Sequence, residues 1–135
     1  MNQRTTLIWA CILGGTGVMI GAFGAHALKS ILEASGRLDT FETAVKYQFY
    51  HALALLAVGL MIQHFGARAL HYAALLFVLG VIFFSGSLYV LCLTGIGVLG
   101  AVTPLGGLLL IAGWITLAVG ATKKGKAPER GLHNY

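Results

Sequence analysis

Charged residues are scarce in this sequence, and their scarcity excludes a water-soluble globular domain. Only 10% of the 135 residues are Asp, Glu, Lys or Arg, and the mean hydropathy is +0.85. Soluble domains carry about a quarter charged residues. Three stretches contain no charged residue at all, namely residues 5–28, 47–67 and 69–122. We therefore expect an integral membrane protein.

Carboxylates are rarer still, which removes most catalytic chemistry from consideration. The chain has four, and none lies in an uncharged stretch: Glu33, Asp39, Glu42 and Glu129. The sequence also lacks the nucleophile-elbow, phosphate-binding-loop and zinc-protease motifs. We expect no enzymatic activity, no cofactor and no metal site.

Cysteine occurs twice, at Cys11 and Cys92. With four membrane crossings the two residues fall near opposite membrane faces, too far apart for a disulfide. Neither belongs to a metal-binding pattern, so we expect two small buried apolar residues.

The long apolar stretches predict four membrane-spanning helices. A spanning helix needs roughly 20 apolar residues, so the first two stretches hold one span each and the third holds two. The expected spans are residues 7–28, 45–65, 70–92 and 105–122. Residues 93–104 are glycine-rich and uncharged, and we expect an irregular connection there. The predicted fold is an all-α, antiparallel up-down four-helix membrane bundle formed by residues 1–122.

Glycines recur at helical spacing in the first and last spans. Small residues spaced in this way let the backbones of membrane helices approach closely. We expect two packing stripes, and the alternative for the first one is a narrow pore lining. The glycines concerned are Gly14, Gly17, Gly21 and Gly24 in the first span, and Gly106, Gly113 and Gly120 in the last.

The basic residues predict the orientation. Six of them fall on the side of the two termini, including four in residues 123–135, whereas Lys29, Arg37 and Lys46 fall on the other side. The positive-inside rule then places both termini in the cytoplasm, with residues 123–135 as a basic tail. Because these residues flank apolar spans, we assign the sequence pI of about 9.5 to contacts with anionic lipids. We expect no nucleic-acid partner.

Polar side chains inside spans are costly and are therefore candidate functional residues. All four spans place such residues toward the outer membrane face. This polar layer has two interpretations: a mutually bonded network that sets helix register, or a binding site for a lipid headgroup, a quinone-like molecule or an ion. Its members are His26, Tyr47, Gln48, Tyr50, His51, Ser85, Ser87, Tyr89 and Thr103.

Two histidines of this layer, His26 and His51, are expected to point into the bundle at similar depth. An imidazole facing lipid tails would leave its nitrogens unpaired. Facing imidazoles would also suit haem or metal ligation, but no carboxylate, cysteine partner or HxxxH spacing accompanies them.

Four segments together resemble a known family, the YwdK/YgdD-like small multi-pass membrane proteins found widely in bacteria and with eukaryotic relatives. The segments are GAFGAHAL from Gly21, AVKYQFYHALAL from Ala44, FSGSLY from Phe84, and TPLGG from Thr103 followed by Gly113-Trp114. The resemblance implies a bacterial inner-membrane location and no settled activity.

These observations favour a non-enzymatic membrane protein that binds a lipid or small ligand, or assists a membrane complex, through the polar layer. The alternatives are a transporter or channel component and a haem or quinone redox subunit. The expected partners are membrane lipids, with a membrane-protein partner or a second copy of the chain as further options.

Overall fold

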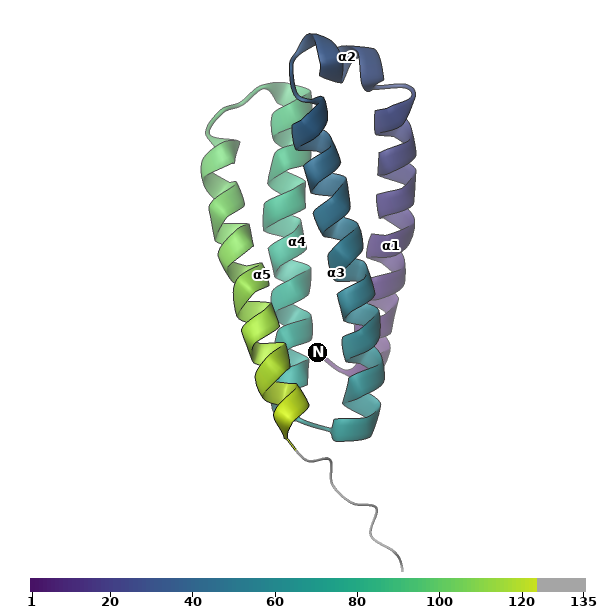
Figure 1. Ribbon diagram of the computed structural model, residues 1–135, viewed down its shortest axis with the longest axis vertical. Helices are drawn as coiled ribbons and strands as arrows, with labels where there is room; N and C mark the ends of the chain where they lie inside the picture. Colours follow the sequence, from purple (N-terminus) through teal and green to yellow (C-terminus); the bar gives the residue numbers. More distant parts are fainter. Residues whose placement is uncertain (124–135) are drawn as a thin grey trace, which may run out of the picture.

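The computed structural model describes residues 1–123, and this part of the chain is almost entirely helical. Its four long helices are α1 (Gln3–Ala25), α3 (Leu38–Phe65), α4 (Arg68–Thr94) and α5 (Leu99–Thr122), while the short helix α2 (Lys29–Ala34) joins α1 to α3 (Figure 1). Each long helix has the length and hydropathy to cross a membrane. The predicted all-α four-helix membrane fold is confirmed.

The long helices run up and down, with α3 and α4 in the centre (Figure 1). Helix α1 packs on α3, and α5 packs on α4. The amino group of Met1 donates a hydrogen bond to the carbonyl oxygen of His71 (3.2 Å), near the start of α4. Gly120, near the end of α5, packs against Leu70. Both ends of the described chain therefore lie at one end of the bundle, here called the terminal end, and α2 covers the other, the α2 end.

The helix bounds differ from the predicted spans in three places. Helix α1 begins at Gln3, because the Asn2 side chain accepts a hydrogen bond from the Thr5 amide (2.8 Å) and caps the helix. Helix α3 begins at Leu38, within the hydrophilic connection. Helix α5 begins at Leu99, so only residues 95–98 are irregular, and Pro104 lies inside the helix. A proline inside a helix removes one backbone hydrogen bond, whereas an irregular connection in lipid would leave several backbone amide and carbonyl groups unpaired.

Arg37 ties the α2 connection to the end of α4. Its Nη1 donates a hydrogen bond to the carbonyl oxygen of Leu91 (3.1 Å), one of the last carbonyls of that helix. Gly95 ends α4 in the left-handed conformation, and a Cβ there would lie 3.2 Å from the same Nη1. A small apolar core of Leu32, Phe41 and Cys92 fills the space below. The α2 end is thereby closed by packed side chains.

Both cysteines are free thiols. Cys92 is buried as expected, but Cys11 is exposed on α1, so the prediction of two buried cysteines was wrong for Cys11. Its exposed position beside the contact of α1 with α3 explains the difference, because a thiol packs as readily against lipid as against protein. Of the predicted tail, residues 124–135 lie outside the described residues.

The glycine stripes lie where the two outer helices contact the central ones, namely between α1 and α3 and between α4 and α5, and we call these two contacts seams. The four glycines of α1 face α3, where Cβ atoms built on Gly17 and Gly21 would lie 3.4 Å from Gln48 Nε2 and 3.2 Å from Val45 Cγ1. The three of α5 face α4, and a Cβ on Gly106 would come within 2.3 Å of the Phe84 backbone nitrogen. Both stripes therefore face a neighbouring helix across a seam.

Candidate functional site: a polar layer and a groove between α1 and α3

Gln48 joins three helices at the centre of the polar layer. Its side chain is almost fully buried, and its Nε2 donates to the Leu13 carbonyl oxygen and to Thr16 Oγ1, both at 2.9 Å. Its Oε1 accepts a hydrogen bond from the Tyr89 hydroxyl at 2.7 Å. Both donor hydrogens and the acceptor oxygen are used. Gln48 therefore fixes the positions of α1, α3 and α4 relative to one another.

Three hydroxyl groups link α4 to its two neighbours. Ser85 Oγ donates to the Ala44 carbonyl oxygen of α3 at 2.7 Å. Ser87 Oγ lies 2.7 Å from Thr103 Oγ1 of α5. Each hydroxyl has a protein partner, so these bonds form without a ligand.

His51 joins α3 to α5 through a bond that the sequence did not predict. Its Nε2 lies 3.1 Å from Trp114 Nε1, and its Nδ1 lies 2.7 Å from the Tyr47 carbonyl oxygen. An indole nitrogen can only donate, so Nε2 accepts and Nδ1 carries the proton. The imidazole is therefore neutral in this arrangement. Trp114 directly follows Gly113 of the packing stripe, and this position was the sequence feature from which a contact between Trp114 and another helix could have been predicted.

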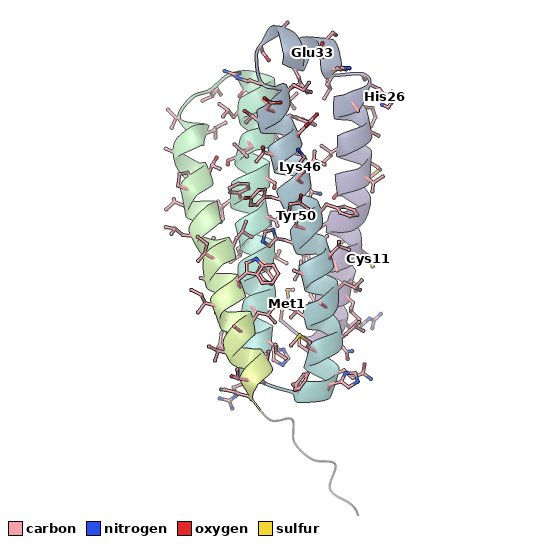
Figure 2. All side chains as sticks on the ribbon, viewed as in Figure 1. Met1, Cys11, His26, Glu33, Lys46 and Tyr50 are labelled. Atoms are coloured by element: carbon pink, nitrogen blue, oxygen red, sulfur yellow. The ribbon has the colours of Figure 1, made fainter. Side chains whose placement is uncertain are left out.

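His26 does not join the layer, and the prediction that it points into the bundle was wrong. The side chain is exposed at the α2 end of α1, and its Nδ1 lies 3.0 Å from the Ala22 carbonyl oxygen of its own helix (Figure 2). At the end of α1 a free helix carbonyl is within reach, so the ring needs no partner from another helix. His26 and His51 do not face each other.

Tyr47 and Tyr50, two further members of the predicted layer, are exposed at the surface of α3. The Tyr47 and Tyr50 side chains are 41% and 57% exposed, and Figure 2 shows Tyr50 on the near face of the bundle. The Tyr47 ring packs on the Phe84 ring with centroids 4.7 Å apart. Adjacent helical residues point about 100° apart, so burying His51 turns Tyr50 outward. Tyr47 lies one turn before His51 and shares its face, with ring centroids 6.2 Å apart, whereas Tyr50 points away from it.

The buried members of the layer already have hydrogen-bond partners within the protein. Within residues 1–123 every buried side-chain nitrogen and oxygen has a hydrogen-bond partner. The same residues hold no group of three or more His, Cys, Asp or Glu side chains placed to bind a metal ion. A ligand would have to displace bonds already made, which favours the interpretation of the layer as a device for helix register.

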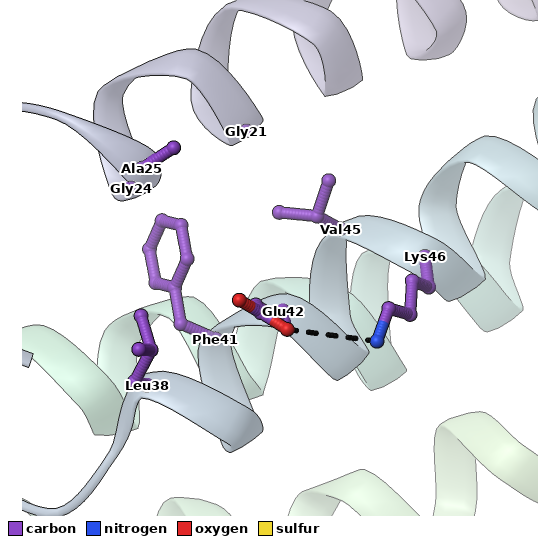
Figure 3. A pocket seen from close by; sticks show the side chains of 8 residues that line it. All are labelled: Gly21, Gly24, Ala25, Leu38, Phe41, Glu42, Val45 and Lys46. Carbon is purple, nitrogen blue, oxygen red and sulfur yellow. Dashed lines mark ion pairs between the residues drawn. The ribbon is translucent and has the colours of Figure 1, made fainter. Parts of the chain in front are cut away.

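A groove lies beside the layer, between α1 and α3 at the α2 end (Figure 3). Gly21, Gly24 and Ala25 form one wall, and α3 forms the other. The groove holds about 150 Å³, and the residues that line it from α3 are Leu38, Phe41, Glu42, Val45 and Lys46. Glu42 and Lys46 stand at its rim with Nζ and Oε2 3.6 Å apart. The glycine spacing predicted helix packing or a narrow pore lining, and it did not predict this hollow.

A second hollow continues the same seam toward the terminal end. It holds about 130 Å³, and its lining residues are Ala10, Cys11, Gly14, Phe49, Ala52, Leu53 and Leu56. The α3 residues Glu42, Lys46, Phe49, Leu53 and Leu56 are spaced by three or four, so they share one helix face. Cys11, Gly14, Gly21 and Ala25 of α1 follow one another at spacings of three, seven and four, so they also share one face. The two hollows therefore lie in line along one seam, which we call the α1–α3 groove, with the Phe49 ring and Gly17 between its halves.

Comparison with known proteins places the chain among membrane proteins of unknown function. Residues 20–107 match the family described as "Protein of unknown function (DUF423)". A UPF0382 membrane protein of Staphylococcus saprophyticus is 45% identical over 116 residues, which cover 83% of this chain and 95% of that protein. The UPF0382 inner membrane protein YgdD of Escherichia coli K12 is 37% identical over 123 residues, covering 91% and 93%. No solved structure matches the chain.

Proposed function

The chain belongs to the DUF423 family of proteins of unknown function, and from this premise we propose that it is a non-enzymatic membrane protein that binds a lipid in the α1–α3 groove. The bound part is one acyl chain, lying along the seam with its headgroup at the α2 end. The observation that carries the proposal is the alignment of the two hollows on one face of the seam.

The length of the groove supports an acyl chain as its occupant. From Glu42 to Leu56 is fourteen residues of α3, which at about 1.5 Å per residue is roughly 21 Å. Half of a bilayer core of about 30 Å is roughly 15 Å. The groove is therefore long enough to pass through one leaflet. Except for the Glu42 and Lys46 side chains at one end, the residues that line it are apolar or glycine.

The polar layer supports the proposal by keeping the groove walls in place. Gln48 bonds α3 to the Leu13 carbonyl and to Thr16 of α1, beside the groove and between its two halves. A lipid chain gains affinity from a preformed groove, because little protein has to be ordered on binding. The two hydrogen bonds of Gln48 to α1 thus set the width of the groove without entering it.

We further propose that the termini lie in the cytoplasm, which places the headgroup end of the groove in the outer leaflet. The relative YgdD is an inner membrane protein. In residues 1–123 the terminal end carries Arg4, Arg68 and Lys123 and no acidic residue, whereas the α2 end carries as many basic residues together with Glu33, Asp39 and Glu42. The positive-inside rule favours the more basic side for the cytoplasm. A carboxyl-terminal reporter that is active only outside the cytoplasm would contradict this orientation.

The test of lipid binding is to fill the groove. In Val45→Phe a phenyl ring replaces a small side chain that lines the hollow facing Gly21 (Figure 3). The matched control is Val90→Phe on α4, where Val90 is 46% exposed and does not line the groove. Native mass spectrometry of the full chain in mild detergent measures lipid retention. We expect wild type and Val90→Phe to retain lipid and Val45→Phe to lose most of it.

Thermal melting shows whether Val45→Phe is folded. Should that variant unfold, Ala25→Phe fills the groove from its exposed end, at the last residue of α1. Equal lipid retention by a folded groove variant and Val90→Phe contradicts the proposal. So does a second protein chain or a coloured cofactor that co-purifies in place of lipid.

A further inference from the structure

We propose that the α1–α3 groove selects a phospholipid whose headgroup carries a primary ammonium group beside its phosphate, with Lys46 binding the phosphate and Glu42 binding the ammonium. This inference rests on the proposed function and names the lipid class. It follows from the two charged side chains at the groove, which have opposite signs and are neighbours.

Glu42 and Lys46 are available to a ligand. Their side chains are 52% and 59% exposed, and the 3.6 Å separation of Lys46 Nζ and Glu42 Oε2 is that of a loose ion pair (Figure 3). Exposed pairs of this kind contribute little to stability, so a ligand can exchange partners with them at low cost. A headgroup with one negative and one positive charge can replace the Glu42–Lys46 contact by two others, one between Lys46 and the phosphate and one between Glu42 and the ammonium.

The other charged side chains at the α2 end either have partners of their own or do not line the groove. Lys29 and Glu33 pair with each other on α2, with Nζ and Oε1 3.9 Å apart. Arg37 bonds the Leu91 carbonyl oxygen, and Asp39 lies in the first turn of α3 and does not line the groove. The charge pattern seen by a headgroup at the groove is therefore that of Glu42 and Lys46.

The depth of the pair suits the boundary between headgroups and acyl chains. Lys46 lies two turns inside α3, and a lysine at such a position extends its ammonium toward the interface while its methylene groups stay among apolar atoms. The rim charges are then level with the phosphates, and the hollow facing Gly21 and Val45 lies at the start of the acyl chains.

The headgroup chemistry predicts a selectivity order. An ethanolamine ammonium has three N–H donors for the Glu42 carboxylate. A choline group has the same positive charge but no N–H donor. A glycerol headgroup has no positive group, so its lipid has a net negative charge and Glu42 repels its phosphate. We expect retention to fall from phosphatidylethanolamine through phosphatidylcholine to phosphatidylglycerol.

The experiment is a competition among three lipids with identical dioleoyl chains. The full-length protein is mixed with equimolar phosphatidylethanolamine, phosphatidylcholine and phosphatidylglycerol, and native mass spectrometry measures the bound ratios. Wild type should prefer ethanolamine over glycerol by about threefold or more, the scale of one exposed ionic contact. Glu42→Gln should abolish this preference. Glu33→Gln, which removes the carboxylate of the other pair at the same end, should leave it unchanged.

The outcomes separate this inference from the proposed function. Lipid bound without headgroup preference in wild type, or a preference that survives Glu42→Gln, overturns the headgroup assignment and leaves the acyl groove standing. A preference lost equally in Glu33→Gln also overturns it, because general surface charge would then be the cause. Failure of wild type to bind any of the three lipids overturns both.

Discussion

The two glycine seams of this protein look alike in sequence and pack differently. In the α4–α5 seam, Cβ atoms built on Gly106 would come within 2.7 Å or less of the Phe83 and Phe84 backbones, so the helices touch backbone to backbone. In the α1–α3 seam, a Cβ on Gly14 would lie 3.9 Å from the Ala52 Cβ, at ordinary contact distance. The glycines of the α4–α5 seam lie in tight contact, and the hollow lined by Phe83, Leu105, Leu108 and Leu109 involves none of them, whereas the hollows of the α1–α3 seam are lined by its glycines.

The side chains facing each stripe explain the difference. Along α5 the glycines receive Phe77 and Leu70, large side chains that fill the space. Along α1, Gly14, Gly17 and Gly21 face Ala52, Gln48 and Val45, which are smaller or are held by hydrogen bonds, and only Gly24 at the α2 end faces a large side chain, that of Phe41. A glycine stripe therefore permits a close approach, and the residues of the partner helix decide whether the approach closes the seam.

The largest expected effect is the loss of stability when one methyl group is added to a glycine of the tight α4–α5 seam. Gly106→Ala places a Cβ against backbone atoms that cannot move aside, and it should lower the free energy of unfolding by about 3 kcal/mol. The same substitution at Gly14 should change it by less than about 1 kcal/mol. Denaturation of the full chain in mixed micelles measures both. Similar losses in the two variants would show that the seams are equally tight.

A smaller effect is expected from the bond that holds the open seam. Gln48→Leu removes three hydrogen bonds of about 0.6 kcal/mol each, so unfolding should become easier by about 2 kcal/mol. The control is Gln63→Leu, because Gln63 is exposed and bonds only the Gln3 side chain. It should stay within about 0.5 kcal/mol of wild type. Equal stability of Gln48→Leu and Gln63→Leu would mean that packing alone holds α1 on α3.

The smallest effect distinguishes the two histidines. His51→Leu loses the bonds to Trp114 and to the Tyr47 carbonyl and should cost about 1 kcal/mol. His26→Leu loses only a bond within its own exposed turn and should cost less than about 0.5 kcal/mol. The same micelle denaturation measures the two variants. A larger loss of stability for His26→Leu than for His51→Leu would mean that the His26 side chain makes contacts inside the bundle.

Much of the fold was predictable, because lipid imposes strong rules on sequence. The uncharged stretches predicted four spanning helices, and glycine spacing predicted which faces of α1 and α5 meet other helices. The start of α5 was harder to place, because Pro104 resembles the beginning of a helix although the chain is already helical at Leu99. In lipid the need to pair backbone amides outweighs the local preference of proline.

The candidate site was predictable only in part. Polar residues inside spans attracted attention to Gln48, His51, Ser85 and Tyr89, all of which make bonds between helices. Which of them bind a ligand stays a prediction. The groove was missed because small residues such as Gly14, Gly21 and Ala25 create it, and a hollow left by small side chains has no sequence signature of its own.

Composition and periodicity by themselves determined the class of protein, the number of spans and the glycine faces. These properties depend on the cost of placing charges and unpaired amides in lipid, which each segment meets separately. Only the tertiary structure decided that His51 bonds Trp114, that His26 faces outward, and that the α1–α3 seam stays partly open. Those outcomes depend on the rotation of each helix about its axis, which is set by the fit between side chains of helices far apart in the sequence.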